Sequence, residues 1–399
     1  MLSVLLLLAV LQPAARPGAD PATNWPGALL HIDDDDGPEI VAYLQPEMEL
    51  VAVRLSIQME EYPGAVSGAV AHQQLVRDRL SAAVARLGGR VELERRPTHV
   101  VYTLVGPGRE LPGMVAALRQ ALLSPAGTSD ELTAAWLRAE RVALAEMEIP
   151  AARVRHELWR RFEAADDAGD ALVAVHGPGA LPAFWHRYYR PERMRVIVVG
   201  GTDENTILAV FSDWEAPSGS AGALPPLRVE VDPAPQLMAP WVGIAYDGRA
   251  IPLATLAVAT RLLNNAVTDT GAREAAAELW LQGDGAATVL VASGPPGSTG
   301  SAAVRRLADA LTGSMDAAAV LASDAAVERA RRSLRRDLFY ASRTPEGLAE
   351  LLGDFADRTG DVGTVGRLLS QLDRVEGADV RAALRVLASR HPMVVELTP

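Results

Sequence analysis

The pattern of apolar and polar positions changes period along the chain, and each period predicts an element. Residues 50–58, LVAVRLSIQ, alternate apolar and polar side chains, which is typical of a half-buried β-strand. A later segment has the period of a helix, because apolar side chains recur every three to four residues at Val76, Leu80, Ala83, Val84 and Leu87. We expect this helix to begin near Ser67 and to end at the pair Gly88–Gly89.

The same criteria predict the other elements of the first half of the chain. Two strands, RVELERR and THVVYTLVGPG, follow the first helix. Further strands are predicted at Trp25–Ile32, Glu39–Leu44 and Met194–Val199. Helices are predicted at Leu111–Leu123, Ser129–Met147, Ala151–Ala165 and Leu181–Tyr189.

A segment rich in Gly, Pro, Ser and Ala, Glu215–Leu227, has the composition of a linker, and the pattern of the first half returns after it. Val101–Leu122 and Thr288–Leu311 each predict a strand, a Gly/Pro turn and an amphipathic helix. Each is followed by a Ser-Asp pair that suits a helix N-cap, Ser129–Asp130 and Ser323–Asp324. The repeat predicts a duplicated α+β unit, with a first domain at 25–214, a linker at 215–227 and a second domain at 228–399.

Composition excludes several classes of function. The 399 residues include 38 Lys and Arg against 50 Asp and Glu, a net charge of −12, and no basic stripe stands out, so nucleic acid is not an expected partner. The chain has no cysteine, which excludes disulfides, thiolate metal sites and cysteine nucleophiles. It also lacks the G-x-S-x-G, Walker A and G-x-G-x-x-G motifs.

The first residues carry an apolar run, Leu2–Leu11, that is too short to span a bilayer, which needs about 20 residues. The run has the length of the apolar region of a secretory signal peptide, although no Lys or Arg precedes it. We therefore predict a signal peptide at 1–19 and an exported protein, periplasmic or extracellular, with no later membrane span. An apolar N-terminus without a targeting role is the alternative. The acidic run Asp33–Asp36 is interpreted as a solvated loop, because calcium loops place their oxygen ligands at alternate positions.

Several stretches, taken in order, resemble one family of metallopeptidases. They are VAVRLSIQ, SGAVAHQQLV, ARLGGRVELERRPTHVVYTLVGP, AERVALAEMEI, FWHRYYRPERMRVIVVGG and, at the end of the chain, VEGADVRAALRVLASRHPMVVELTP. This order is similar to that of the insulinase/pitrilysin family, which includes the mitochondrial processing peptidase and the core proteins of the bc1 complex. The resemblance covers nearly the whole mature chain. It implies two duplicated α/β-roll domains, each a mostly antiparallel sheet packed with helices, that clamp around a peptide.

The resemblance also implies a zinc site, which this chain does not complete. In the family motif H-x-x-E-H, histidines at i and i+4 of one helix bind the same ion, the glutamate activates the bound water, and a distant glutamate is the third ligand. Here His72 occupies the first ligand position, Leu75 that of the general base and Val76 that of the second ligand, while Glu146 matches the distant glutamate. Leu and Val cannot bind metal, so we expect no zinc, no other cofactor and no catalytic residue in this chain.

Two other groups of residues are candidates for chemistry. Many members of the family carry an Arg and a Tyr, seven residues apart, that hold the substrate carbonyl, and Arg273 and Trp280 have this spacing. They are the candidate substrate-binding residues, although an indole N–H is only a donor. The alternative is an Arg and a Trp on the edge of an amphipathic helix. The segment His156–Arg160, HELWR, approaches H-E-x-x-H, but arginine replaces the last histidine and would repel a metal.

These expectations combine into one predicted function and two alternatives. The chain is predicted to be a non-catalytic subunit that forms a heterodimer with an active zinc peptidase and supplies half of a peptide-binding chamber. One alternative is an active metallopeptidase with a rebuilt site, which turnover by the purified chain would favour. The other is a structural scaffold like the bc1 core proteins, which stable residence in a membrane complex would favour.

Overall fold

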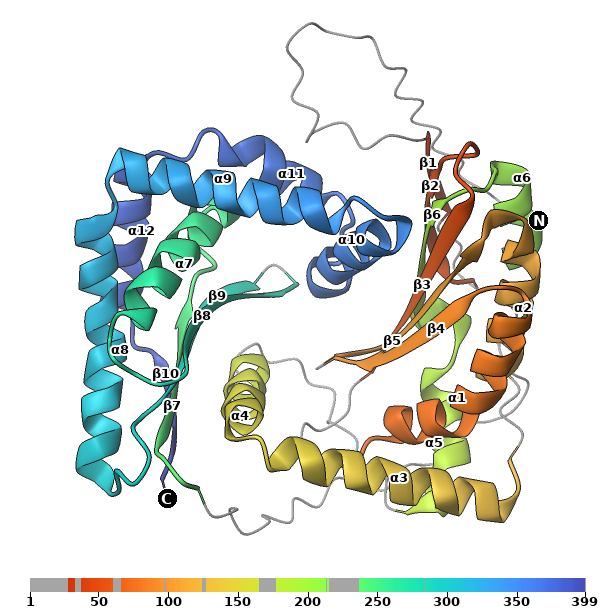
Figure 1. Ribbon diagram of the computed structural model, residues 1–399, viewed down its shortest axis with the longest axis horizontal. Coiled ribbons are helices and arrows are strands. Elements are labelled where there is room, and N and C mark those ends of the chain that lie inside the picture. The colour runs from red at the N-terminus through yellow and green to blue at the C-terminus, as the bar shows by residue number, and fades with distance from the viewer. Residues whose placement is uncertain are drawn as a thin grey trace, which may run out of the picture. The chain divides into compact units, whose positions relative to one another are not determined.

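The computed structural model describes residues 28–32, 37–59, 66–96, 98–123, 127–164, 177–212, 214, 237–283 and 285–398. These residues form two compact units, each built on one β-sheet (Figure 1). Unit 1 comprises the described residues of 1–143, 170–229 and 341–357, and unit 2 those of 144–169, 230–340 and 358–399. The fold is α+β with two mostly antiparallel sheets, as the sequence predicts.

Unit 1 contains a six-stranded sheet. Its strands lie in the spatial order β1 (Ala28–Ile32), β2 (Glu39–Leu44), β6 (Met194–Gly200), β3 (Leu50–Gln58), β5 (His99–Pro107) and β4 (Arg90–Arg95). All neighbours are antiparallel except β2 and β6, which are parallel. Among the described strands β4 pairs only with β5, so β4 is an edge of this sheet.

The two faces of this sheet differ in chemistry. Along β3, Val53, Leu55 and Ile57 point into the core of unit 1, whereas Arg54 and Ser56 point to the opposite face. The helices that contribute to the core on the apolar face are α1 (Gly68–Arg86), α2 (Leu111–Leu123), α5 (Leu181–Tyr188), α6 (Glu204–Phe211) and much of α3 (Ser129–Met147). The polar face is contacted by α10 (Pro345–Thr359), a helix from the second half of the chain.

Helix ends follow the predicted caps, with one shift. The side chain of Ser67 accepts a hydrogen bond from the Val70 N–H at 3.0 Å and starts α1, and Gly88, at φ +77°, follows its last turn. The predicted cap at Ser129 is wrong by one residue. Thr128 caps α3 instead, because its Oγ1 accepts from the Glu131 N–H and the Glu131 carboxylate accepts from the Thr128 N–H.

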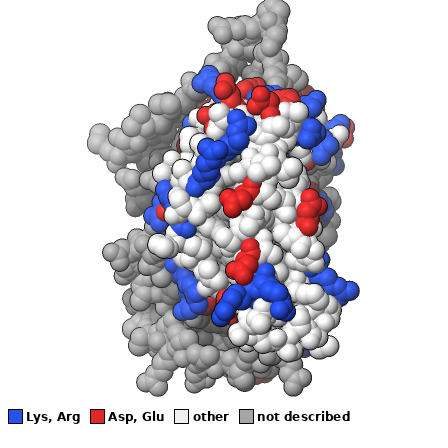
Figure 2. All heavy atoms as spheres, turned by 90° about the vertical axis from the view of Figure 1, so that its left-hand side faces the viewer, with Lys and Arg blue, Asp and Glu red and all other residues white. Residues whose placement is uncertain are grey.

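Unit 2 contains a four-stranded antiparallel sheet. Its strands lie in the order β10 (Met393–Leu397), β7 (Trp241–Asp247), β9 (Gly285–Ser293) and β8 (Ala275–Gln282). Its helices are α4 (Pro150–Ala164), α7 (Leu253–Thr268), α8 (Ser301–Leu321), α9 (Asp324–Ala341), α11 (Thr364–Leu372) and α12 (Gly377–Ser389). Exposed residues of α8 include Thr312, Gly313, Ala317 and Val320. Figure 2 shows the side of the molecule on which α8 lies, where wide uncharged areas separate the charged side chains.

Each unit takes one helix from the other half of the sequence. Helix α4 precedes the predicted linker but packs against β7 and β10, where Val154 and Leu158 are fully buried in the core of unit 2. Helix α10 follows the linker but belongs to unit 1. The compact units therefore differ from the two halves of the chain at these two helices.

The two predicted strand–turn–helix segments are both present, as β5 to α2 and as β9 to α8. Short 3-10 helices at Gly108–Glu110, Pro178–Ala180 and Pro191–Arg193 complete the described elements of unit 1. The predicted signal peptide, the acidic run Asp33–Asp36 and the linker 215–227 lie outside the described residues. Within the part of the chain that is described, no helix has the length and apolar character needed to cross a membrane.

Candidate functional site

The helix that carries the degenerate zinc motif places His72 inside the core of unit 1. His72 is fully buried, and its Nδ1 shares a 2.8 Å hydrogen bond with the hydroxyl of Tyr102. That hydroxyl lies 3.1 Å from the hydroxyl of Tyr189, whose ring packs on the imidazole at a centroid distance of 4.1 Å. The ring of Trp185 meets the imidazole edge-on, and its indole N–H donates to the Gly68 carbonyl. His72 therefore belongs to an aromatic network that joins α1, β5 and α5.

Burial controls the charge of this network. Loss of solvent lowers the pKa of His72 to about 3 and outweighs the backbone of Ala121, which acts in the opposite direction. Burial also raises the pKa of Tyr102 far above its usual range, although the hydrogen bond to Tyr189 acts in the other direction. Both side chains are therefore neutral near pH 7.

The other positions of the motif are also in apolar surroundings. Leu75 is 7% exposed and Val76 is 5% exposed, and both belong to the core of unit 1. Glu146 is half-buried near the end of α3, in the part of that helix assigned to unit 2. No group of three or more metal-ligating side chains comes together among the described residues. The expectation that the chain holds no zinc stays a prediction.

The two candidate substrate-binding residues lie on strand β8 and the turn before it, so the alternative of a helix edge is wrong. Arg273 is exposed, and its backbone N–H donates to the Ser293 carbonyl at 3.1 Å. Trp280 is buried, packs against Trp159 at a centroid distance of 5.3 Å and donates its indole N–H to Glu278 at 3.2 Å. Seven residues of extended strand span about 23 Å, so the two side chains do not form one compact site.

The segment HELWR lies on α4, and its glutamate, Glu157, forms ion pairs with arginines of the same helix. Arg160 Nε donates to the Glu157 carboxylate at 3.0 Å, and Arg161 donates to the same carboxylate. The glutamate that would activate a metal-bound water in H-E-x-x-H is therefore paired with two arginines of its own helix.

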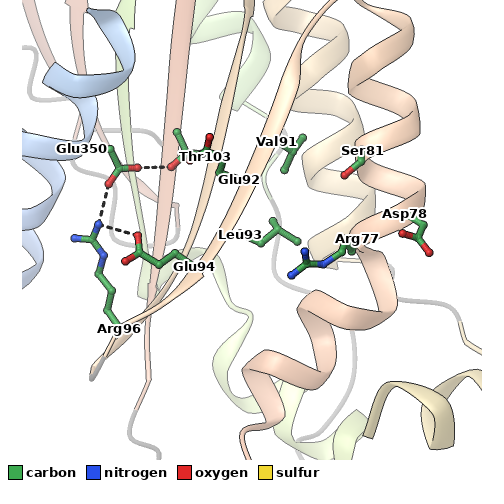
Figure 3. Close-up of a pocket in the computed structure, with 10 residues that line it drawn as sticks. All are labelled: Arg77, Asp78, Ser81, Val91, Glu92, Leu93, Glu94, Arg96, Thr103 and Glu350. Carbon is green, nitrogen blue, oxygen red and sulfur yellow. Dashed lines mark hydrogen bonds and ion pairs between the residues drawn. The ribbon is translucent and has the colours of Figure 1, made fainter. Parts of the chain in front are cut away.

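A pocket that sequence reasoning missed lies beside the edge strand β4. It has a volume of about 780 Å³ and is lined by Arg77, Asp78, Ser81, Val91, Glu92, Leu93, Glu94, Arg96, Thr103 and Glu350 (Figure 3). Residues of α1 line it through Arg77, Asp78 and Ser81, which lie on a different side of the helix from His72 and Val76. Charged residues alternating with apolar ones in RVELER are typical of an exposed edge, and this signal could have identified it.

Specific contacts hold the walls of this pocket in place. The buried amide of Gln73 donates to the carbonyls of Glu94 and Val101, at 3.0 and 3.3 Å, and so attaches α1 to the β4–β5 hairpin. Arg96 binds the carboxylates of Glu94 and Glu350, both at 2.9 Å, and the hydroxyl of Thr103 also donates to Glu350 (Figure 3). The result is a preformed, charged pocket along an edge strand.

Next to this pocket, the polar face of the sheet meets α10 through a buried ionic cluster. Arg54 is fully buried on β3 and reaches Asp357 at 2.7 Å, Glu350 at 3.3 Å and Asp354 at 3.4 Å. Ser56 donates to Asp357 at 2.6 Å. Burial alone would raise the pKa of Asp357, but Arg54, His99 and Ser56 together outweigh it, and the pKa is lowered. Asp357 is therefore ionised near pH 7.

No protein-family model matches the sequence, and no curated protein matches it either. Solved structures do match. An M16-like peptidase of Alicyclobacillus acidocaldarius superposes with a TM-score of 0.66 at 14% identity, over 94% of this chain and 99% of that chain. A domain of Pseudomonas fluorescens described as a peptidase M16 inactive domain has a TM-score of 0.66 at 12% identity, over 92% of this chain and 97% of its own.

A third match is to the periplasmic protease PqqL of Escherichia coli, with a TM-score of 0.65 and 12% identity. It covers 98% of this chain but 49% of PqqL, so this chain spans about half of that protein. At such low sequence identity, these matches show a similar fold and do not show a shared activity. The chain has the two-unit fold of the M16-like, or insulinase/pitrilysin-type, peptidases over nearly its whole length, as the sequence resemblance implied.

Proposed function

We propose that this chain is a non-catalytic member of the insulinase/pitrilysin family that binds an extended peptide and works beside an active zinc peptidase. The observation that carries the proposal is the contrast within α1. Its motif positions His72, Leu75 and Val76 are committed to the core, while its other side still lines an open pocket along an edge strand. The chain thus keeps a surface suited to a peptide, while side chains of the core occupy the positions of the zinc motif.

An edge strand is a template for peptide binding. In an antiparallel pair, every second residue of β4 directs its N–H and C=O away from β5, and an added strand can pair with them. Val91 and Leu93 offer apolar contacts on one side of the strand, and Glu92 and Glu94 offer charged contacts on the other. A peptide would therefore gain affinity from its backbone and selectivity from alternate side chains.

The absence of chemistry is proposed from the residues present. A hydrolytic zinc site needs three protein ligands and a base for the metal-bound water. A leucine and a valine stand at two of these positions, and the one histidine shares its Nδ1 with Tyr102. The similar domain of Pseudomonas fluorescens is described as inactive, which supports the idea that this fold is used without catalysis.

Two further parts of the proposal concern place and partner. Export to the periplasm is supported by the apolar N-terminal run and by the periplasmic location of PqqL. Pairing with an active homologue is supported by the incomplete site, because a peptide bound here could be cleaved only by a zinc centre on another polypeptide.

The test is to measure peptide binding and turnover with the purified chain and zinc. An unstructured fluorescent peptide is expected to bind without being cleaved. The same peptide with N-methyl groups on alternate residues is expected to bind much more weakly, because it cannot complete the ladder with β4. Equal affinity for the two peptides would show that binding is not strand addition. Zinc-dependent cleavage by the chain alone would favour the active-enzyme alternative.

A further inference from the structure

The side of α10 that faces the sheet of unit 1 is an acidic stripe. Its carboxylates recur every three or four residues and therefore share one side of the helix: Glu346, Glu350, Asp354 and Asp357. Each meets an arginine of the sheet or of its hairpin. At the outer end, Arg90 pairs with Glu346, and Arg96 pairs with Glu350 and Asp354. Arg54 pairs with Glu350, Asp354 and Asp357. Arg195 lies 3.6 Å from Asp357.

The centre of this contact is close and dry. Asp357 is 3% exposed in its side chain, and Arg54 is not exposed at all. A Cβ on Gly353 would clash with the guanidinium of Arg54, so the helix backbone lies directly against this group. The outer pairs are wetter, since Glu350 and Asp354 are 29% and 33% exposed in their side chains.

The contact gains little from the hydrophobic effect. Leu348 and Leu352 are buried, but at 100° per residue they lie roughly opposite the acidic stripe on α10. The aliphatic side chains Val53 and Leu55 of β3 point to the other face of the sheet. Buried ion pairs gain about as much from attraction as they lose in desolvation, so an interface of this composition is only marginally favourable.

We propose that α10 is a charge-held gate on the polar face of the sheet of unit 1, and that its release opens the β4 pocket. Glu350 is the residue of α10 that lines the pocket, where it accepts from Thr103 and Arg96. When α10 leaves, the pocket loses this wall and the arginines of the sheet become accessible to water. This proposal does not depend on what the pocket binds.

The test uses the absence of cysteine from the chain. Ser56 is 1% exposed and lies under α10, so Ser56→Cys places a single thiol that a small alkylating reagent reaches only after release. Ser314→Cys, on α8 and 2% exposed, is the matched control for unfolding in general. Raising NaCl from about 0.05 M to about 0.5 M stabilises the separated charges and is expected to speed alkylation at position 56 about tenfold, with no change at position 314.

A second pair of variants separates the gate from general loss of charge. Glu350→Gln in the Ser56→Cys background is expected to speed alkylation at low salt, whereas Glu328→Gln, an ion-pair loss on α9, is not. Equal salt responses at positions 56 and 314, or equal effects of the two glutamine variants, would overturn the proposal. Hydrogen exchange of the unaltered protein gives the same answer if Ser56→Cys does not fold. The amides of α10 should then lose protection with salt before those of α7, and equal protection would count against the gate.

Discussion

At the scale of single residues, the neutral imidazole of His72 makes the stability of the protein depend on pH. The folded state holds this group at a pKa of about 3, against an ordinary value of 6.5, so the unfolded chain binds the proton more readily. Stability is therefore fully present above pH 6.5 and is lost as the pH falls toward 3. His99, whose pKa burial lowers to about 4, acts in the same direction.

We expect His72 to account for a loss of about 2 kcal/mol in the free energy of unfolding between pH 7 and pH 5. The measurement is urea unfolding at both values for the unaltered protein and for His72→Phe, which cannot titrate. The variant should be less stable at pH 7, because the hydroxyl of Tyr102 loses one of its two hydrogen-bond partners and keeps only Tyr189, but its pH dependence should be weaker. An unchanged pH dependence would mean that His72 is not buried in its neutral form.

A second prediction concerns restoration of the zinc motif. Leu75→Glu with Val76→His recreates H-x-x-E-H, but the structure places both side chains in the core of unit 1. We expect the double variant to lose roughly 3–5 kcal/mol of stability from the buried carboxylate and imidazole. Zinc should not recover this loss in urea unfolding. The apolar variant Leu75→Met with Val76→Ile is the control, and a zinc-dependent rise in stability would show that the metal geometry survives.

The burial of the motif could have been predicted from the helix period itself. The period assigns Val76 and Leu80 to the core face of the helix, and Val76 is also the second ligand position. Residues i and i+4 share a face, so the assignment of Val76 to the core already places His72 there. What local spacing cannot give is the set of partners. Tyr102 and Tyr189 reach His72 from β5 and from the end of α5, 30 and 117 residues farther along the chain.

At the scale of elements, strand β8 distinguishes the two candidate substrate-binding residues. Trp280→Ala is expected to cost about 3–5 kcal/mol of stability, since the indole packs against Trp159 of α4 in the core of unit 2. Arg273→Ala, on an exposed turn, should change stability by less than about 0.5 kcal/mol. Denaturant unfolding of both variants checks this. A fully stable Trp280→Ala that no longer binds peptide would return Trp280 to a role in recognition.

Element limits were more predictable than element neighbours. The period of apolar residues predicts the bounds of β3, α2 and α3 correctly, because these limits depend on local turns and caps. The order of strands depends on contacts between distant segments. The parallel pairing of β2 with β6 has no local signature, and the only local sign of the edge position of β4 is the alternation of charged and apolar residues in RVELER, which does not identify its neighbours. The pocket beside β4 was missed for this reason.

At the scale of the whole molecule, the proposed pairing with an active zinc peptidase makes a prediction about Arg273. If the second half of this chain faces the zinc centre of the partner, the exposed guanidinium supplies a hydrogen-bond donor to the substrate. Arg273→Ala should then leave assembly intact and slow the turnover of the mixed complex by on the order of 10²-fold.

The measurement is co-purification followed by a peptide cleavage assay. Arg332→Ala, at an exposed arginine of α9, is the control and should change neither property. Failure to isolate a mixed complex would favour the scaffold alternative. A complex whose turnover is unaffected by Arg273→Ala would keep the pairing but exclude this residue from the chamber.

Helix α10, which comes from the second half of the chain but belongs to unit 1, also determines when unit 1 can be completed during synthesis. Arg54 and its partner Asp357 are 303 residues apart. The N-terminal sheet therefore emerges from the ribosome before α10 has been made, and Arg54 then has no carboxylate of α10 to pair with. At about 5–20 residues per second, the delay between the synthesis of Arg54 and that of Asp357 is roughly 15–60 s. During this interval the nascent chain should be open to chaperones and to proteases. A chain that is to be threaded unfolded through an export channel would benefit from such a delay, because unit 1 is complete only after Asp357 has been made.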